Sequence, residues 1–314
     1  MTAIVVWGAF RTRPETVAER FPDDRVIPIA DENALAVAAD ADVALSGNNP
    51  ARVRKLLDAT PKLRWYHTVS AGVENMPLAE LRNRGIVLTN NSGSYDVQIA
   101  EHVMMFVFAA SRQLQLYRDR QLRREWKDHE HQELRDATIV VYGMGSIGAE
   151  VARLASAVGM RVIGVRRRAA PHAGVSRVVP PEQLADVVGE ADYLAITAPL
   201  TDATRGAVSR VVIARLKPTA WVVNIARGAI VDESALIDAL HERRIAGAAL
   251  DVFEKEPLPT ESPLWTMENV ILTPHVSGDS PRVQDRTLAL FAENLRRYKS
   301  GEPLLNRVDF GRGY

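Results

Sequence analysis

Residues Ala137–Gly148 read Ala-Thr-Ile-Val-Val-Tyr-Gly-Met-Gly-Ser-Ile-Gly, a short apolar run followed at once by glycines in the pattern G-x-G-x-x-G. A helical pattern begins at Ala149. A strand, a glycine turn and a helix in this order form a dinucleotide-binding fingerprint. The helix start offers unpaired N–H groups and a partial positive charge to phosphates. The sequence therefore predicts a nucleotide site in mid-chain.

The glycines of this turn have separate expected roles. Gly143 permits the tight turn, Gly145 lets the backbone approach a pyrophosphate, and Gly148 lets the helix pack on the strand. We expect the whole turn to contact the cofactor, through Gly143, Met144, Gly145, Ser146, Ile147 and Gly148.

Composition excludes several classes of protein. The chain has 314 residues, of which 46% are hydrophobic and 25% charged, as in a globular protein of one large or two ordinary domains. The formal net charge is zero, so no global field favours nucleic acid or an anionic membrane. Cysteine is absent, which excludes disulfides, thiol catalysis and Cys-ligated metals. The first residues read as a strand rather than a signal peptide, so a cytoplasmic protein is expected.

Short apolar runs alternate with helical patterns on both sides of the fingerprint, which favours parallel sheets covered on both faces. Val97–Arg124 is expected to form one long connecting helix, and Pro281–Lys299 to return to the first domain. The expected domains are a substrate domain, 1–97 with 281–314, and a dinucleotide-binding domain, 98–280. Strands are expected at Ile4–Trp7, Arg25–Ile29, Val43–Ser46, Trp65–Val69 and Ile86–Thr89, then at Thr138–Tyr142, Arg161–Val165, Tyr193–Ile196, Trp221–Ile225, Ala248–Val252 and Val270–Leu272.

The second strand of the nucleotide unit bears on the choice of cofactor. An acid at its end would hold the ribose hydroxyls of NAD. Here Arg166, Arg167 and Arg168 follow the strand instead. Guanidinium groups pair with a ribose 2′-phosphate, so NADP is the expected cofactor, with NAD as the alternative. Lysine occurs at only six positions, however, so arginine runs also arise here by general bias.

Three further segments place polar side chains just after different strands. Arg227 follows Trp221–Ile225, Asp251 and Glu256 follow the next strand, and His275 follows the last one. Ligands bind at the carboxyl ends of strands in open α/β sheets. Reduction of a carbonyl by a nicotinamide needs a proton donor, a carboxylate beside it, and a cation for the substrate carboxylate. His275, Glu256 and Arg227 would supply one each.

These motifs together resemble the D-isomer-specific 2-hydroxyacid dehydrogenase family. The resemblance covers nearly the whole chain, and its motifs are Val69–Val73, Ala100–His102, Val141–Gly148, Thr197–Thr204, Val223–Asp232, Ala248–Pro259 and Leu272–Gly278. It implies a Rossmann nucleotide domain inserted into a flavodoxin-like substrate domain, both of them doubly wound α/β units. It also implies a homodimer built around the Val97–Arg124 helix and the nucleotide domains.

The resemblance also assigns roles to residues. It implies Arg227, Glu256 and His275 as the catalytic set, and the backbone N–H groups of Gly72 and Val73 as ligands of the substrate carboxylate. It implies that Asp251 and the carbonyl of Ile225 face the nicotinamide carboxamide, and that Ala198 and Pro199 line the adenosine. Thr204, Ala226, His275 and Gly278 complete the expected cofactor contacts.

Two features of the sequence refine the expected reaction. Related formate dehydrogenases carry Gln where Glu256 stands, which disfavours that activity. The run Arg166–Arg168 departs from the common acidic residue of the family and resembles the NADP-using glyoxylate/hydroxypyruvate reductase branch. The sequence thus predicts an NADPH-preferring reductase of small 2-oxo acids, with hydroxypyruvate and glyoxylate as lead substrates.

Two alternatives remain open at this point. One is oxidation of phosphite by a family member with the same three residues. The other is a nucleotide-sensing corepressor or scaffold without turnover, because a fold alone does not establish catalysis. A metal site is not expected, since His129 and His131 lack the i, i+4 spacing of a helical zinc pair.

Overall fold

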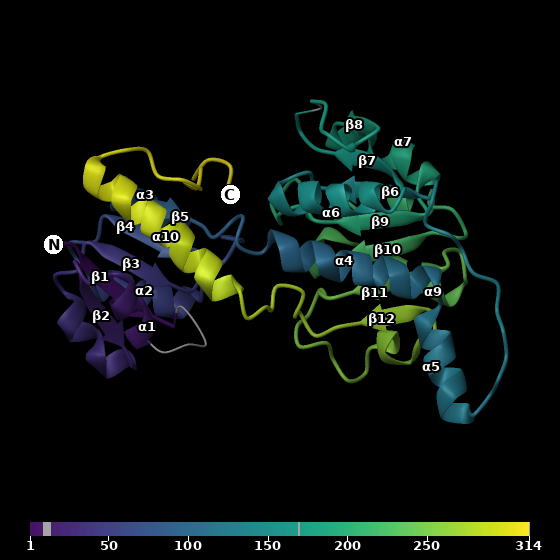
Figure 1. The fold of residues 1–314 in the computed structure, drawn as a ribbon, viewed down its shortest axis with the longest axis horizontal. Coiled ribbons are helices and arrows are strands. Elements are labelled where there is room, and N and C mark those ends of the chain that lie inside the picture. Colours follow the sequence, from purple (N-terminus) through teal and green to yellow (C-terminus); the bar gives the residue numbers. More distant parts are fainter. Residues whose placement is uncertain (9–13, 169, 314) are drawn as a thin grey trace. The chain divides into compact units, whose positions relative to one another are not determined.

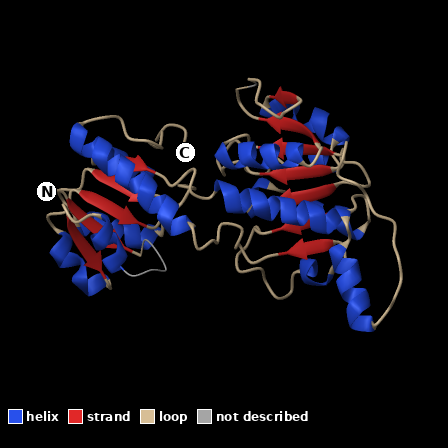
Figure 2. Ribbon diagram, in the orientation of Figure 1, coloured by secondary structure: helices blue, strands red, loops and turns tan. Residues whose placement is uncertain are grey.

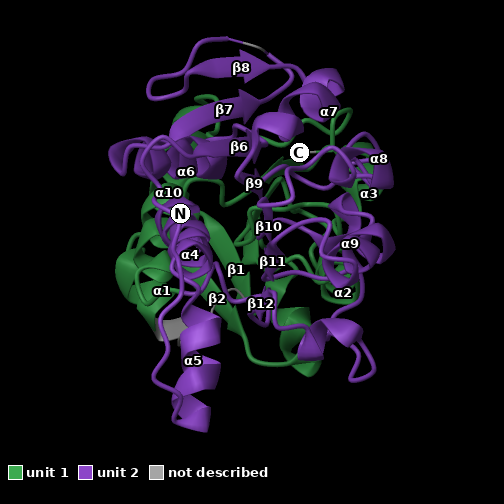
Figure 3. Ribbon diagram, turned by 90° about the vertical axis from the view of Figure 1, so that its right-hand side faces the viewer, with its two compact units in different colours: residues 1–95, 280–314 green, residues 96–279 purple. Residues whose placement is uncertain are grey.

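The computed structural model describes residues 1–8, 14–168 and 170–313. The chain divides into two compact units, which Figure 3 shows in different colours. Unit 1 consists of residues 1–95 and 280–314, and unit 2 of residues 96–279. The chain thus leaves unit 1 once and returns to it after unit 2 is complete.

Unit 1 contains a parallel five-stranded sheet in the order β2-β1-β3-β4-β5 (Figure 1), which is the flavodoxin-like order. Its strands are β1 (Ala3–Trp7), β2 (Arg25–Ile29), β3 (Val43–Ser46), β4 (Trp65–Thr68) and β5 (Val87–Thr89). Its helices are α1 (Pro14–Arg20), the 3-10 helix η1 (Glu32–Ala38), α2 (Pro50–Ala59), α3 (Leu78–Asn83) and α10 (Val283–Ser300).

Aromatic packing fixes the C-terminal helix α10 onto the sheet of unit 1. Phe291 of α10 stacks on Trp65 of β4, with ring centroids 5.1 Å apart, and Phe21 meets Phe291 edge-on at 5.3 Å. Trp65 and Phe291 are fully buried. Burial of such rings contributes about 1.5–3 kcal/mol each, so α10 is an integral part of unit 1 despite its distance in sequence.

Unit 2 contains a parallel seven-stranded sheet in the order β12-β11-β10-β9-β6-β7-β8. Its strands are β6 (Thr138–Tyr142), β7 (Arg161–Val165), β8 (Arg177–Val179), β9 (Tyr193–Ile196), β10 (Trp221–Asn224), β11 (Gly247–Leu250) and β12 (Val270–Leu272). This is the Rossmann order with one more strand at its far edge. The strand order reverses between β6 and β9, which is where dinucleotides bind in such sheets.

Helices cover both faces of the unit 2 sheet, as Figures 2 and 3 show. One face carries α4 (Asp96–Ser111) and α6 (Ser146–Ala157), and the other carries α7 (Leu184–Val187), α8 (Arg210–Ile213) and α9 (Glu233–His241). Short 3-10 helices occur at η2 (Pro181–Gln183), η3 (Val188–Glu190), η4 (Gly228–Ile230) and η5 (Pro263–Thr266). The prediction of two doubly wound parallel sheets is confirmed.

Two local predictions were wrong. The expected single helix Val97–Arg124 is two helices, α4 and α5 (Leu114–Arg123), because Gln113 between them has φ +50° and ends the α-helical path. The short edge strand β8 was missed, since three residues that pair with β7 on one side only leave almost no apolar pattern.

No helix among the described residues is long and apolar enough to cross a membrane.

A buried histidine lies inside unit 1. His67 on β4 is fully buried, and its Nδ1 lies 2.8 Å from the Thr89 hydroxyl. The Trp65 indole N–H donates to the same hydroxyl at 2.8 Å, and Thr89 can give its own proton to Nδ1 of His67. Burial lowers the pKa of His67 to about 3, although Asn91 acts in the opposite direction. The imidazole is therefore neutral in the folded protein.

This burial predicts a loss of stability at mildly acidic pH. In the unfolded chain His67 takes up a proton near pH 6.5, whereas the folded state keeps it neutral down to about pH 3. The unfolding free energy should therefore fall as the pH drops below about 6.5, by up to ~1.4 kcal/mol per pH unit. Denaturant titrations between about pH 7.5 and 5.5 would measure the slope before carboxylates titrate.

His67→Asn, which keeps an acceptor for the Thr89 hydroxyl, is the control. Burial also lowers the pKa of His102, against the charge of Asp251, and this contributes in the same direction. The difference between wild type and variant therefore isolates His67. An equal slope in both proteins would contradict the assignment.

Candidate active site

Three neighbouring strands of unit 2 end level with one another. In the parallel register Asn224 of β10 pairs with Leu250 of β11, and Leu250 pairs with Leu272 of β12. These are the last residues of their strands. The segments that follow carry Arg227, Glu256 and His275, so the sheet delivers the predicted catalytic set to one edge.

Glu256 and His275 form a direct pair. The Glu256 Oε2 atom lies 2.7 Å from His275 Nδ1, and the other oxygen, Oε1, accepts the Phe253 N–H at 3.0 Å. The histidine side chain is 47% exposed and the glutamate 34%. The carboxylate therefore fixes the ring through Nδ1 and leaves Nε2 as the nitrogen that can exchange a proton with a substrate.

The backbone at His275 lies in the left-handed region, with φ +53°. For a residue with a Cβ this conformation costs roughly 1–2 kcal/mol, so surrounding contacts must hold it. The His275 N–H donates to the Asp251 carbonyl at 2.8 Å. The Asp251 carboxylate accepts the next two amides, Val276 N–H at Oδ1 and Ser277 N–H at Oδ2, both at 2.9 Å.

Asp251 is fully buried, unlike Glu256. Burial by itself would raise the pKa of Asp251, but hydrogen bonds from Ser277, Thr273 and the backbone amides of Val276 and Ser277 bring it below its usual value. The Asp251 carboxylate is therefore ionised, and through these hydrogen bonds it holds the segment that carries His275. Its expected contact with a nicotinamide carboxamide stays a prediction.

The Arg227 segment is held by Asn224, the last residue of β10. The Asn224 side-chain amide donates to the Arg227 carbonyl at 3.0 Å, and its oxygen accepts the Ala226 N–H at 3.1 Å. The Arg227 guanidinium donates to the Ala226 carbonyl at 2.6 Å. A Cβ on Gly228 would lie 1.9 Å from the backbone carbon of Phe253, so only glycine lets these two segments touch.

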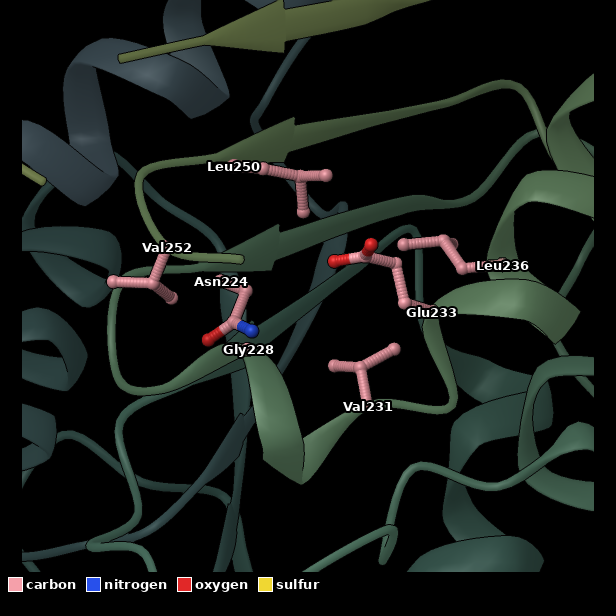
Figure 4. A pocket seen from close by; sticks show the side chains of 7 residues that line it. All are labelled: Asn224, Gly228, Val231, Glu233, Leu236, Leu250 and Val252. Atoms are coloured by element: carbon pink, nitrogen blue, oxygen red, sulfur yellow. The ribbon is translucent and has the colours of Figure 1, made fainter. Parts of the chain in front are cut away.

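A second carboxylate supports the Glu256 segment from below. Glu233, at the start of α9, accepts the Glu254 N–H at 2.9 Å. Figure 4 shows Glu233 and Asn224 lining a small cavity between β10, β11 and α9. Its volume is about 10 Å³, the size of one water, so it does not hold a substrate.

The glycine turn after β6 has the geometry of a phosphate cradle. Gly143 has φ +110°, and a Cβ there would lie 2.3 Å from the Ala198 amide nitrogen; a Cβ on Gly148 would lie 2.1 Å from the Gly143 carbonyl oxygen. At Gly145, by contrast, nothing lies within 4 Å of a Cβ. Gly145 caps α6 without a side-chain hydrogen bond, so the helix N–H groups can receive an anion. The turn therefore fits a dinucleotide pyrophosphate.

Other expected cofactor residues lie around this turn. Ala198 packs on Gly143, and Thr197 donates its hydroxyl to the Gly143 carbonyl at 2.6 Å. The Thr204 hydroxyl donates to the Pro199 carbonyl at 2.6 Å, so it shapes the 199–204 turn. Met144, Ile225 and Ala226 are buried, Ile147 is half-buried and Ser146 is exposed, and the Gly278 carbonyl accepts the Gln98 side-chain amide at 3.2 Å.

The arginine run follows β7 directly. Arg166 is half-buried, while Arg167 and Arg168 are exposed. Within the described residues, Arg166 and Arg168 have no carboxylate within ion-pairing distance. Charges of this kind at the end of the second strand suit a ribose 2′-phosphate.

In unit 1, the predicted substrate loop follows β4. Asn48 donates to the Gly72 carbonyl at 3.4 Å, Asn90 to the Ala71 carbonyl at 3.0 Å, and Tyr95 to the Val69 carbonyl at 2.6 Å. Among the described residues, the N–H groups of Gly72 and Val73 have no acceptor. The loop is thus held through its carbonyls and leaves two amides for an anion.

No metal centre emerges from the described residues, among which no three His, Asp or Glu side chains are grouped to hold an ion. His131 lies 3.0 Å from the Tyr117 hydroxyl, and His129 is exposed.

Comparison with known proteins decides the family. Residues 104–277 match the model of the D-isomer specific 2-hydroxyacid dehydrogenase NAD binding domain, which is more than half of the chain. The chain belongs to this family. It is therefore an NAD(P)-dependent oxidoreductase, and the predictions of the family and of an enzyme are confirmed.

Individual relatives agree with this assignment. A glyoxylate reductase of Korarchaeum cryptofilum is 36% identical over 265 residues, 81% of this chain and 79% of that protein. The D-3-phosphoglycerate dehydrogenase of Methanocaldococcus jannaschii is 34% identical over 88% of this chain, which spans 53% of that longer protein. The NADPH-dependent glyoxylate/hydroxypyruvate reductase SmGhrA of Sinorhizobium meliloti, solved with NADP and sulfate, superposes with a TM-score of 0.86 at 29% identity over both full chains.

Sequence reasoning missed the supports of the site. Asn224, Glu233 and Thr273 hold the segments that carry Arg227, Glu256 and His275. Their position at strand ends and at a helix start was visible in the sequence. Their partners were not, because those contacts join segments that only the sheet brings together.

The open space at Gly145 predicts a selective loss of cofactor binding. Gly145→Ala should leave the unfolding free energy within about 0.5 kcal/mol, since its Cβ meets no protein atom. It should weaken NADPH binding at least about 10-fold, because the methyl group occupies the path of the pyrophosphate. Fluorescence titration and thermal unfolding would measure the two effects.

Gly148→Ala is the matched control, since its Cβ would clash with the Gly143 carbonyl and should lower stability as well as binding. NADPH binding by Gly145→Ala at the wild-type level would place the pyrophosphate elsewhere.

Proposed function

We propose that this protein reduces small 2-oxo acids, with glyoxylate and hydroxypyruvate as lead substrates, to D-2-hydroxy acids and prefers NADPH. The observation that carries the proposal is the Glu256–His275 pair, 2.7 Å apart, at the edge of the sheet that also presents Arg227. A bound nicotinamide would supply the hydride; the chain must bind the substrate and deliver a proton.

Arg227 binds and polarises the substrate in this proposal. Its guanidinium pairs with the substrate carboxylate and draws electron density from the carbonyl. The free amides of Gly72 and Val73 serve the same carboxylate. The support is that both amides lack acceptors among the described residues.

His275 delivers the proton. Nε2 donates it to the carbonyl oxygen as negative charge develops there. Glu256 holds Nδ1 and stabilises the imidazolium before the transfer. The left-handed backbone at His275 and the hydrogen bonds to Asp251 keep the ring in place during turnover.

NADPH is the preferred cofactor because Arg166 and its neighbours replace the expected acid at the end of β7. The turn Gly143–Gly148 holds the pyrophosphate, and Ala198, Pro199 and Thr204 line the adenosine side. Ile225, Ala226, Asp251 and Gly278 lie toward the nicotinamide. SmGhrA, which was solved with NADP, has the same fold over its full length.

Initial rates would test the substrate and cofactor together. Glyoxylate, hydroxypyruvate, pyruvate and phenylpyruvate would each be assayed with NADPH and NADH. We expect the highest kcat/KM for glyoxylate or hydroxypyruvate with NADPH. A higher kcat/KM with NADH would overturn the cofactor assignment. Turnover of phosphite with NADP would favour phosphite oxidation. NADPH binding without any turnover would favour the nucleotide-sensing corepressor or scaffold.

Replacement of Arg227 tests the proposed mechanism. Arg227→Ala should lower kcat/KM for glyoxylate by about 100- to 1,000-fold or more, because a charge-assisted contact to the substrate is lost. Arg227→Lys should recover part of it, since a point charge remains without the bidentate fork. Near-wild-type activity of the alanine variant would remove Arg227 from the mechanism.

We also propose a homodimer formed through α4 and α5. Large apolar side chains are exposed along α4, α5 and the segment that follows α5, and α5 has no buried residue. The exposed side chains are Met105, Phe108, Leu114, Leu122 and Trp126. A second copy would cover them. Sedimentation equilibrium at micromolar concentration would report the mass of two chains, and a monomer would contradict the proposal.

A further inference from the structure

A histidine on α4 is connected to the His275 segment through one hydroxyl group. His102 Nε2 lies 3.1 Å from the Thr273 hydroxyl, and this hydroxyl lies 2.5 Å from Asp251 Oδ1. Nε2 itself is 4.0 Å from the carboxylate, so the hydroxyl is the intermediary. Phe106, one turn further along α4, packs edge-on against the His102 imidazole, with ring centroids 4.6 Å apart, and this contact restrains the plane of the imidazole.

The direction of these hydrogen bonds is determined. Asp251 is ionised, because its hydrogen bonds lower its pKa despite burial, and it can only accept. The single proton of the Thr273 hydroxyl therefore points to Asp251. The hydroxyl then accepts from His102, whose Nε2 must carry a proton. Burial lowers the pKa of His102 against the charge of Asp251, which favours a neutral ring with the proton on Nε2.

The series of contacts from His102 through Thr273 to Asp251 ends at the backbone around His275. Asp251 Oδ1 accepts both the Thr273 hydroxyl and the Val276 N–H, while Oδ2 accepts the Ser277 N–H. The His275 N–H donates to the carbonyl of the same aspartate. The Asp251 carboxylate can rotate about its Cβ–Cγ bond, and the hydrogen bond from the Thr273 hydroxyl limits that rotation. His102 in turn holds the hydroxyl in its donating orientation.

We infer that His102 is a positioning residue for His275, acting through the Thr273 hydroxyl and the Asp251 carboxylate. This inference rests on the proposed function for its kinetic consequence. His102 touches neither substrate nor cofactor in this role. Its loss lets the 275–277 backbone leave the orientation in which His275 faces the substrate, and misplacement of a catalytic group by about 1 Å costs up to about 100-fold in rate.

Paired variants at both positions would test the inference. His102→Leu and Thr273→Val remove the donor and the hydroxyl at similar volume. Each should lower kcat for glyoxylate reduction at least about 10-fold, with the Kd for NADPH changed less than about 2-fold. His102→Gln and Thr273→Ser keep the hydrogen-bonding groups and should stay within about 3-fold of wild type. The double variant should lose no more than the worse single one, because both act on one chain of contacts.

Amide hydrogen exchange gives a readout that does not need activity. Exchange at the Val276 and Ser277 amides should become faster in His102→Leu and Thr273→Val, and return toward wild type in His102→Gln and Thr273→Ser. If wild type reduces no 2-oxo acid, the proposed function fails while this result still decides the inference. Unchanged kcat and exchange in His102→Leu, or equal losses in the Leu and Gln variants, would overturn it.

Discussion

The parallel register of β10, β11 and β12 is the constraint on which the site depends. Asn224, Leu250 and Leu272 end their strands side by side, so the following segments leave the sheet at one edge. The strands themselves are largely buried, and a shift by one residue would turn every buried side chain to the opposite face. The hydrophobic core therefore sets, at a distance, where Arg227, Glu256 and His275 can stand. Sheet packing thus brings the predicted catalytic segments to one edge, and contacts within the loops, such as the Phe253 N–H to Glu256, then hold the side chains.

The two carboxylates near His275, those of Glu256 and Asp251, have different roles because their surroundings differ. Glu256 is partly exposed and contacts the imidazole ring directly. Asp251 is fully buried, and its oxygens are taken up by Thr273, Val276 and Ser277. A charge in that position is tolerated because every hydrogen bond it accepts comes from the segment it must hold. The hydrogen bonds that offset the free-energy cost of burying the Asp251 charge therefore also order the His275 backbone. That backbone has a conformation that a free loop would rarely adopt.

Much of the fold could be predicted because apolar runs and turn residues are local signals. The runs at Trp65 and Thr138 give strands, and the glycine spacing after Tyr142 gives the turn and the start of a helix. Where local signals were weak, the prediction failed. The edge strand at Arg177 is too short to leave a pattern, and the apolar stripe from Val97 continues across the break at Gln113, so periodicity alone suggests one helix.

The sequence by itself determined the two doubly wound units and the dinucleotide turn, because strand ends and glycine spacing can be counted along the chain. It also gave the predicted proton donor, its carboxylate partner and the cation, which are His275, Glu256 and Arg227. Only the tertiary structure decided how these groups are held. The close approach of Gly228 to Phe253, the support of Glu254 by Glu233, and the contact from His102 through Thr273 to Asp251 all join segments distant in sequence. Such contacts depend on strand order and on which helix covers which face, and these arise only when the sheet assembles and buries its apolar surface.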